Sequence, residues 1–372
     1  MLYDLMHKDT EVLRMNLNDD DGLIQSVESV SSIQHLPVGT FQNGRMNGRD
    51  LRNWWSKRSI PASRSGIRDI LQRLDVPCTT ALVTRCMGLS LSDQYWIRRA
   101  DSDVEWKDVN FFTNEFSEDL GDLMFGHDKG SLDLNTPDNT SDGMLRKRWK
   151  IVDGKRCLIK SGSGTAFQEP FNEVIASTLM DALSIEHTDY GLIWSEGRPY
   201  SICPDFIDKD TELVTAASVI NSYSSKKDTT YDRYVKACSS RGIDIVPYMD
   251  RMIVIDYIMA NGDRHLNNFG LIRDAESLEF LGPAPIFDNG TSLGWDLLTR
   301  EIPGRIGEKS KPFRKTFSEQ LALVTDFGWI DFDALYGALE KVREILATEG
   351  FLDADRIEAV TGLLASRIDS LR

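Results

Sequence analysis

An apolar helix followed directly by a polar loop constrains the fold of this chain more than any other feature. Residues Pro247–Ala260 are predicted to be helical, and apolar side chains lie on nearly every face of that helix. Such a helix is typical of the centre of a lobe, with other elements packed around it. The loop that follows, which contains Asp263 and Asn268, is therefore expected to rest on a rigid base.

The loop carries the string D-x-H-x-x-N, from Asp263 to Asn268, and a second apolar run, Pro285–Phe287, leads to Asp288 in F-D-N-G. In kinase-type phosphoryl transfer, one carboxylate accepts the proton of the attacking hydroxyl, while an amide and a second carboxylate hold Mg²⁺ at the nucleotide phosphates. Asp263 fits the base, and Asn268 and Asp288 fit the metal ligands. Each residue alone is more typical of an ordinary turn, but the three together favour a catalytic site.

His265, inside the same string, is expected to pin the loop, because Asp263 is the better placed proton acceptor. The other histidines are scattered along the chain: His7, His35, His127 and His187. Neither an H-x-x-H nor a C-x-x-C motif is present, so the sequence gives no support to a zinc site.

Composition sets the class of protein. The chain has 372 residues, of which 41% are hydrophobic, enough for a substantial core and two or three subdomains. Its formal charge of -15 opposes a direct affinity for nucleic acid, whose phosphates require clustered Lys and Arg. Five widely spaced cysteines, no signal peptide and no run of about eighteen apolar residues predict a cytoplasmic protein without a membrane segment.

Residues 1–128 are predicted to alternate between helical and irregular segments. A basic island lies between Phe41 and Leu74, and we interpret it as a solvated helix face in preference to a docking surface for a phosphate or a partner. Its basic residues are Arg45, Arg49, Arg52, Lys57, Arg58, Arg64, Arg68 and Arg73. Five aromatic residues are expected to anchor the next segment on a core: Trp96, Trp106, Phe111, Phe112 and Phe116.

The clearest predicted hairpin joins Arg148–Val152 to Lys155–Lys160 through Asp153-Gly154, a pair that suits a type I′ turn. Leu158 and Lys160 share one face of the second strand. A lysine at this position could reach nucleotide phosphates with Leu158 beneath the base, although lysines also end many strands at the water's edge.

A helix predicted to begin at Glu169-Pro170 carries Glu173 in its first turns. In kinase folds, a glutamate on the helix after the lysine-bearing strand fixes the lysine ammonium. The alternative is that Glu173 only complements the helix dipole.

A second predicted hairpin, Leu192–Trp194 with Tyr200–Cys203, leads into Pro204–Ile207, where a kinase has its hinge. Backbone groups near Asp205 and Ile207 would hydrogen-bond adenine there. The stretch Arg305–Lys315 holds five basic residues and one acid. Three further helices are predicted at Phe317–Val324, Phe332–Thr348 and Ala354–Leu371.

This order of motifs over roughly residues 130–372 resembles the HipA-like serine/threonine kinases of bacteria. The resemblance implies an ATP- and Mg²⁺-dependent enzyme in which Lys160 holds the α and β phosphates and Glu173 pairs with Lys160. It also implies that Asp263 is the catalytic aspartate, that Asn268 and Asp288 bind Mg²⁺, and that a protein Ser or Thr is the acceptor. An antitoxin-type partner, as in a toxin–antitoxin system, would follow from the same resemblance.

Three motifs depart from those of protein kinases. The phosphate-covering loop keeps only Gly143 of a G-x-G-x-x-G pattern, Asn261-Gly262-Asp263 replaces H-R-D, and D-N-G replaces D-F-G. The D-x-H-x-x-N string also occurs in lipid kinases and aminoglycoside phosphotransferases. A small-molecule or lipid kinase therefore stays open as an alternative, as does a degenerate kinase that acts as a binding module.

We expect an α+β, bilobal, protein-kinase-like fold. Residues 1–128 would form an N-terminal accessory segment, 129–207 a small N-lobe with an antiparallel β-sheet, and 208–372 a mainly helical C-lobe with the catalytic loop.

Overall fold

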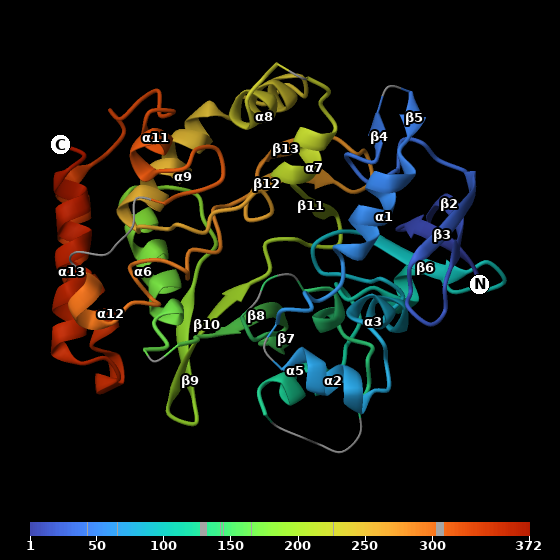
Figure 1. Ribbon diagram of the computed structural model, residues 1–372, viewed down its shortest axis with the longest axis horizontal. Coiled ribbons are helices and arrows are strands. Elements are labelled where there is room, and N and C mark those ends of the chain that lie inside the picture. The colour runs from blue at the N-terminus through green and yellow to red at the C-terminus, as the bar shows by residue number, and fades with distance from the viewer. Residues whose placement is uncertain are drawn as a thin grey trace. The chain divides into compact units, whose positions relative to one another are not determined.

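The computed structural model describes residues 1–42, 44–64, 66–126, 132–141, 143, 145–164, 166–225, 227–302 and 309–372. The chain divides into two compact units, whose elements are labelled in Figure 1. The first unit comprises Met1–Ile159, Asp205–Lys226 and Leu271–Gly282, and the second comprises Lys160–Pro204, Lys227–Gly270 and Pro283–Arg372. The boundary predicted between residues 128 and 129 lies outside the described residues.

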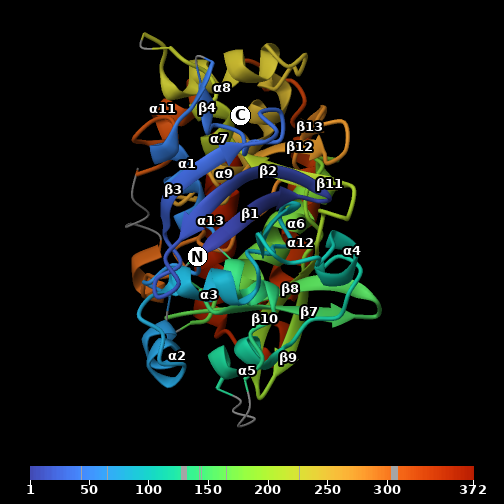
Figure 2. The same cartoon turned by 90° about the vertical axis from the view of Figure 1, so that its right-hand side faces the viewer.

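A four-stranded antiparallel sheet opens the first unit, where the sequence was predicted to be helical and irregular. Its order is β3-β2-β1-β6, and Figure 2 shows β1, β2 and β3 side by side. The strands are β1 Leu2–His7, β2 Thr10–Leu17, β3 Ile24–Val30 and β6 Tyr95–Arg99. In β2, Leu13, Met15 and Leu17 are buried while the residues between them are partly exposed. The prediction was wrong because this period of two was not recognised as a half-buried strand.

Short helices complete the first unit. They are α1 Gly48–Ser56, α2 Ile67–Arg73, α3 Thr79–Arg85, α4 Trp106–Val109, α5 Asp119–Met124, the 3-10 turn η1 Pro137–Thr140 and α7 Ala216–Asn221. Helix α1 buries Leu51 and Trp55 in the same core as the inner face of the sheet. The predicted aromatic anchor is confirmed: Trp96, Trp106, Phe111 and Phe112 are buried in one cluster, with Phe116 packed against it.

Two arginines of the basic island are buried, contrary to the interpretation of a wholly solvated face. Arg58 pairs with Asp93 at 2.6 Å, and Arg64 is 2% exposed. The guanidinium of Arg64 donates to the carbonyl oxygens of Ser141 and Gly143 at 2.6 and 3.0 Å. These two residues therefore have structural partners, whereas the other six basic residues of the island are exposed.

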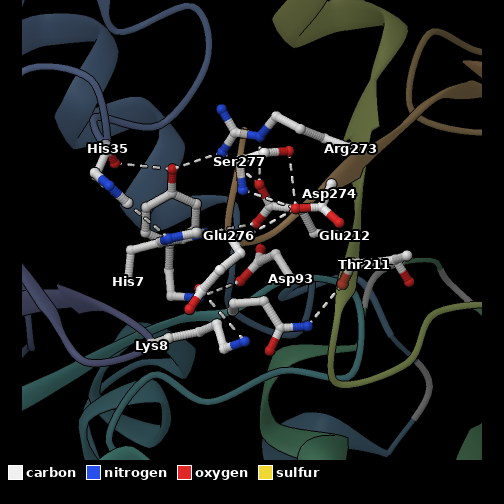
Figure 3. Close-up of polar contacts among 12 residues, drawn as sticks. His7, Lys8, His35, Asp93, Thr211, Glu212, Arg273, Asp274, Glu276 and Ser277 are labelled. Atoms are coloured by element: carbon white, nitrogen blue, oxygen red, sulfur yellow. Dashed lines mark hydrogen bonds and ion pairs between the residues drawn. The ribbon is translucent and has the colours of Figure 1, made fainter. Parts of the chain in front are cut away.

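A buried polar cluster joins the N-terminal sheet to a second sheet of order β11-β12-β13 (Figure 3). The strands of that sheet are β11 Thr211–Thr215, β12 Gly270–Asp274 and β13 Phe280–Pro283. Glu212 accepts from His7 Nε2 at 3.1 Å and pairs with Arg273, whose Nη2 donates to the Tyr95 hydroxyl at 3.0 Å. Burial alone would raise the pKa of Glu212, but His7 and Arg273 lower it. The carboxylate therefore stays ionised inside the first unit.

Both predicted hairpins are present. In the first unit, β7 Lys147–Val152 and β8 Lys155–Ser161 are neighbours, and Asp153 and Gly154 have φ of 49° and 76°, as a type I′ turn requires. In the second unit, β9 Gly191–Ser195 pairs with β10 Arg198–Pro204. Strand β8 contains the boundary between the two units, because Ile159 ends one segment and Lys160 begins the next.

The second unit is mainly helical. Its helices are α6 Glu169–Ala182, α8 Thr230–Ser239, α9 Val246–Ile258, α11 Phe317–Leu321, α12 Phe332–Leu346 and α13 Ala354–Asp369, with 3-10 turns η2 Thr299–Glu301 and η3 Thr348–Gly350. Helix α9 is buried nearly all round, as its sequence predicts. Helix α12 packs against α6 and α13 (Figure 1). Mixed helices with small antiparallel sheets confirm the α+β class.

Within the described residues, no helix combines the length and the apolar character needed to span a membrane.

Asp138 in η1 is a fully buried acid of the first unit. Its Oδ1 accepts from the Trp149 amide at 2.8 Å, and burial raises the pKa of Asp138 to about 7. A carboxyl whose pKa is higher in the folded than in the unfolded state stabilises the fold at low pH. That contribution is lost as the pH rises from the unfolded value, near 4, through about 7.

We therefore predict that Asp138→Asn becomes more stable relative to the unchanged protein as the pH rises from about 4.5 to about 8, because an amide does not ionise. Melting temperatures of the two proteins across this range measure the effect. Asp133→Asn, at an exposed acid of the same segment, is the control. A constant difference between Asp138→Asn and the unchanged protein would contradict the prediction.

Candidate active site

Three charged residues predicted from the sequence meet in the second unit. Lys160, at the end of β8, places Nζ 2.8 Å from Glu173 Oε1 on α6 and 2.8 Å from Asp288 Oδ1. The same ammonium lies 3.2 Å from the hydroxyl of Tyr190. Lys160 and Glu173 are 4% and 2% exposed, so the pair is buried rather than a lysine at the water's edge.

The two carboxylates of Asp288 and Glu173 stabilise the positive charge of Lys160. Burial alone would lower the pKa of Lys160, but Asp288 and Glu173 raise it well above its ordinary value. Lys160 is therefore a cation at neutral pH. Asp288 is the more accessible of its two partners, with a side chain 34% exposed. The arrangement presents one fixed positive charge beside one partly exposed carboxylate.

Glu173 also fixes the segment that carries Asp288. Its Oε2 accepts from the backbone amide of Asn289 at 2.7 Å. Gly290 approaches α6 closely, because a Cβ added there would lie 3.3 Å from Glu173 Oε1 and 3.4 Å from the carbonyl oxygen of Glu169. Glu173 therefore holds both a side chain and a backbone, which helix-dipole complementation alone would not require.

Asp288 itself has left-handed backbone geometry, with φ of 63°. Few non-glycine residues adopt this conformation, and aspartate is one of those that do so most readily. The backbone amide of Asp288 itself donates to the Tyr190 hydroxyl, with the two atoms 3.4 Å apart.

Arg264 links the loop to the D-N-G segment. This guanidinium is fully buried and bonds to both carboxylate oxygens of Asp256 on α9, at 2.7 and 2.9 Å. It also donates to the backbone carbonyls of Asn268 and Phe287 and, at 2.6 Å, to Asn289 Oδ1. One side chain therefore fixes the backbone at Asn268 and immediately before Asp288, the two predicted metal ligands.

The start of the loop is fixed in the same way. Asn261 donates from Nδ2 to Asp256 Oδ1 at 2.9 Å and accepts from the Asp263 amide at 3.2 Å. Asp263 is left exposed and pairs with Lys311, whose Nζ lies 2.8 Å from Asp263 Oδ1. The helix thus delivers Asp263 to the surface on a buried support.

His265 lies in the loop as expected of a residue that pins it. Its Nδ1 faces the backbone amide of Asn267 at 3.3 Å, and its carbonyl accepts from the Asn268 amide at 2.8 Å. Both contacts are local to the turn.

Asn268 and Asp288 offer the donor chemistry that Mg²⁺ prefers, one amide and one carboxylate oxygen. The described part of the chain has no group of three or more His, Cys, Asp and Glu side chains suited to a metal ion. An amide and a carboxylate fit a Mg²⁺ ion that takes its remaining ligands from water and substrate phosphates.

The other predicted nucleotide contacts, Leu158, Gly143, Asp205 and Ile207, belong to the first unit. Gly143 has φ of 94°, which requires glycine. The amide of Asp205 donates to the Arg156 carbonyl at 2.8 Å, and that of Ile207 donates to Asp205 Oδ1 at 3.0 Å. These two backbone donors already have partners, so the hinge role of Asp205 and Ile207 stays a prediction.

Four residues of the site were missed from the sequence: Tyr190, Arg264, Asn289 and Lys311. A signal existed for Arg264, because Asp256 lies in a largely apolar helix and a buried carboxylate requires a cationic or hydrogen-bonding partner. The sequence does not reveal which cation that is.

Comparison with known proteins gives the class of this fold. No family model matches the sequence. HipA in the solved complex of Shewanella oneidensis MR-1 HipA, HipB and operator DNA is 12% identical, with a TM-score of 0.54, and the match covers 100% of this chain and 97% of that chain. The fold is therefore kinase-like.

Sequence similarity leads to a kinase as well. The serine/threonine-protein kinase CtkA of Helicobacter pylori is 30% identical over 132 residues, 33% of this chain and 40% of that protein. The chain thus matches less than half the length of this curated relative. The crystal structure of Helicobacter pylori CtkA matches with a TM-score of 0.47 and 21% identity, over 60% of this chain and 92% of that chain. The comparisons confirm the resemblance to the HipA-like serine/threonine kinase family.

We predict that Arg264→Met loosens both segments that Arg264 holds, because it removes their shared donor and leaves Asp256 buried without its cation. Breaking a buried pair in this way costs about 3–5 kcal/mol. Hydrogen–deuterium exchange should show faster exchange in peptides covering residues 261–270 and 285–292. Arg251→Met, on the outer part of α9, is the control, and equal protection in both variants would contradict the role of Arg264.

Proposed function

We propose that this chain is an ATP- and Mg²⁺-dependent serine/threonine protein kinase of HipA-like type. The observation that carries the proposal is the contact of Lys160 Nζ with Glu173 and Asp288, at 2.8 Å each. In kinases, the lysine–glutamate pair and the metal-binding aspartate must both be in place for phosphoryl transfer. The kinase-like fold and the similarity to CtkA support the same function.

Each residue then has one task. Lys160, held by Glu173, would neutralise the α and β phosphates of the nucleotide. Asn268 and Asp288 would hold Mg²⁺, which supplies charge neutralisation at the phosphates when bound. Asp263 would accept the proton of the acceptor hydroxyl, since it is exposed and has a rigid support through Asn261.

The domain arrangement and the partner are part of the proposal. Residues 129–207 and 208–372 would act as the two lobes, with the nucleotide contacted also by Leu158, Gly143, Asp205 and Ile207. HipA is found with HipB in a toxin–antitoxin complex, and an antitoxin-type protein is therefore the partner we propose here. Incubating the protein and Mg-ATP with lysate, lipids and aminoglycosides separates a protein kinase from a lipid or small-molecule kinase.

We predict that Mg-ATP raises the melting temperature of the protein, because a ligand that binds only the folded state stabilises it. The gain is about 2.7 kcal/mol at a hundredfold excess over Kd. Calorimetry with ATP, with and without Mg²⁺, measures both the affinity and the shift. If the protein binds no ATP in the presence of Mg²⁺, the kinase proposal fails.

We predict different effects for the two acids. Asp263→Asn should keep its affinity for Mg-ATP and lose turnover, because a base acts mainly in the transition state. Asp288→Asn should lose both, with affinity weakened by about 1.5–3 kcal/mol, the usual value of a charge-assisted contact. Titration calorimetry and single-turnover labelling of lysate proteins decide between them, with the exposed Asp296→Asn as control. Equal losses of affinity in both variants would refute the assigned roles.

A further inference from the structure

The basic stretch Arg305–Lys315 has no task in the function proposed so far. Residues 305–308 lie outside the described part, and residues 309–316, which we call the Lys311 loop, belong to the second unit. An antiparallel bridge between Lys309 and Thr316 closes this loop, and the Ser310 amide donates to the Lys315 carbonyl at 2.9 Å. Gln320 of α11 donates to the carbonyl of Lys311.

The Lys311 loop is anchored on the loop that carries Asp263. Phe313 is 8% exposed and packs edge-on against Phe269, which directly follows Asn268, with ring centroids 5.9 Å apart. It also packs against Tyr231, with ring centroids 5.2 Å apart. A Cβ added at Gly262 would lie 3.2 Å from the Lys309 carbonyl oxygen. The two loops are therefore packed together on both sides of Asp263.

This packing delivers one lysine to the candidate base. Lys311 Nζ lies 2.8 Å from Asp263 Oδ1, and the two side chains are 56% and 51% exposed. An ion pair this exposed contributes little to stability. The backbone of the Lys311 loop is nevertheless held by a bridge, a buried aromatic ring and a side-chain hydrogen bond. A cation so placed, in a chain of net charge -15, is better explained by a ligand than by the fold.

The position relative to Asp263 indicates what that ligand is. A general base must lie within hydrogen-bond reach of the acceptor hydroxyl. The oxygen of the acceptor hydroxyl attacks the γ-phosphorus and is bonded to it in the product. The equatorial oxygens of the transferred phosphoryl group therefore lie close to Asp263. Negative charge spreads over these oxygens in the transition state. Lys311 Nζ, in contact with Asp263, is within reach of them.

We propose that Lys311 is a catalytic residue that contacts the transferred phosphoryl group; this inference rests on the proposed kinase function. The bond between the γ-phosphorus and the β–γ bridging oxygen breaks, and ADP leaves with that electron pair. The bond between the acceptor oxygen and phosphorus forms. The hydroxyl proton passes to Asp263, and Lys311 donates hydrogen bonds to the phosphoryl oxygens without giving up a proton.

The test compares ligands that differ only in the presence of a phosphoryl mimic. Affinities for Mg-ADP, and for Mg-ADP with aluminium fluoride, are measured by titration calorimetry on Lys311→Met, Lys311→Arg and Lys315→Met. Lys315 is an exposed lysine of the same loop and serves as the control. Because both positions are exposed, the three variants are expected to fold, and their melting temperatures check this.

Lys311→Met should bind Mg-ADP like the unchanged protein but bind the aluminium fluoride complex roughly 10²-fold more weakly, the usual effect of removing one transition-state donor. Lys311→Arg should recover part of this loss, because it keeps the charge, and Lys315→Met should show none. The rate of single-turnover labelling of lysate proteins should be lowest in Lys311→Met, intermediate in Lys311→Arg and unchanged in Lys315→Met.

The outcomes separate the two proposals. If the unchanged protein binds no Mg-ADP, the kinase function fails and the role of Lys311 fails with it. If the protein binds Mg-ADP, and Lys311→Met and Lys315→Met bind the aluminium fluoride complex equally well, the kinase function stands and the role of Lys311 is overturned.

Discussion

The candidate site depends on one buried cation, the guanidinium of Arg264. Taking a guanidinium out of water is costly, and the cost is offset only when an opposite charge and acceptors for its N–H groups are present. Asp256 supplies the charge from the last turn of a buried helix, and two backbone carbonyls and the Asn289 side chain supply further acceptors. Because these acceptors have to be where the guanidinium can reach them, Arg264 dictates where the chain passes on either side of the metal-ligand candidates.

A second buried pair is connected to the first through Asn289. Its side chain accepts from Arg264, while its backbone amide donates to Glu173, the partner of Lys160. Strand β8, helix α6, the Asp263 loop and the D-N-G segment are thereby tied into one polar network. Groups coupled in this way do not contribute additively to the free energy of unfolding. The network therefore assembles as a unit, and its charged ends are brought into position together.

Local patterns in the sequence predicted those parts of the structure that local physics determines. Asp153-Gly154 specifies its own turn, and the helix after Glu169-Pro170 begins where proline allows it. The N-terminal sheet was missed because the alternation of Leu13, Met15 and Leu17 with polar residues was not recognised as the period of a strand. The pairing of Arg264 with Asp256, and of Lys311 with Asp263, could not be read from spacing alone. Which cation meets which carboxylate is decided by packing between segments distant in sequence, such as Phe313 on Phe269.

The left-handed backbone of Asp288 limits how this position can change. Asparagine and glycine are the residues that most readily share this conformation, whereas longer or β-branched side chains would strain the turn. The substitutions that the backbone tolerates best therefore remove the carboxylate and leave the surrounding hydrogen bonds of Asn289 and Arg264 in place. A lineage that lost its need for catalysis could lose the charge at this single position and keep its fold. A single nucleotide change, from an aspartate to an asparagine or glycine codon, would then convert an enzyme into a scaffold.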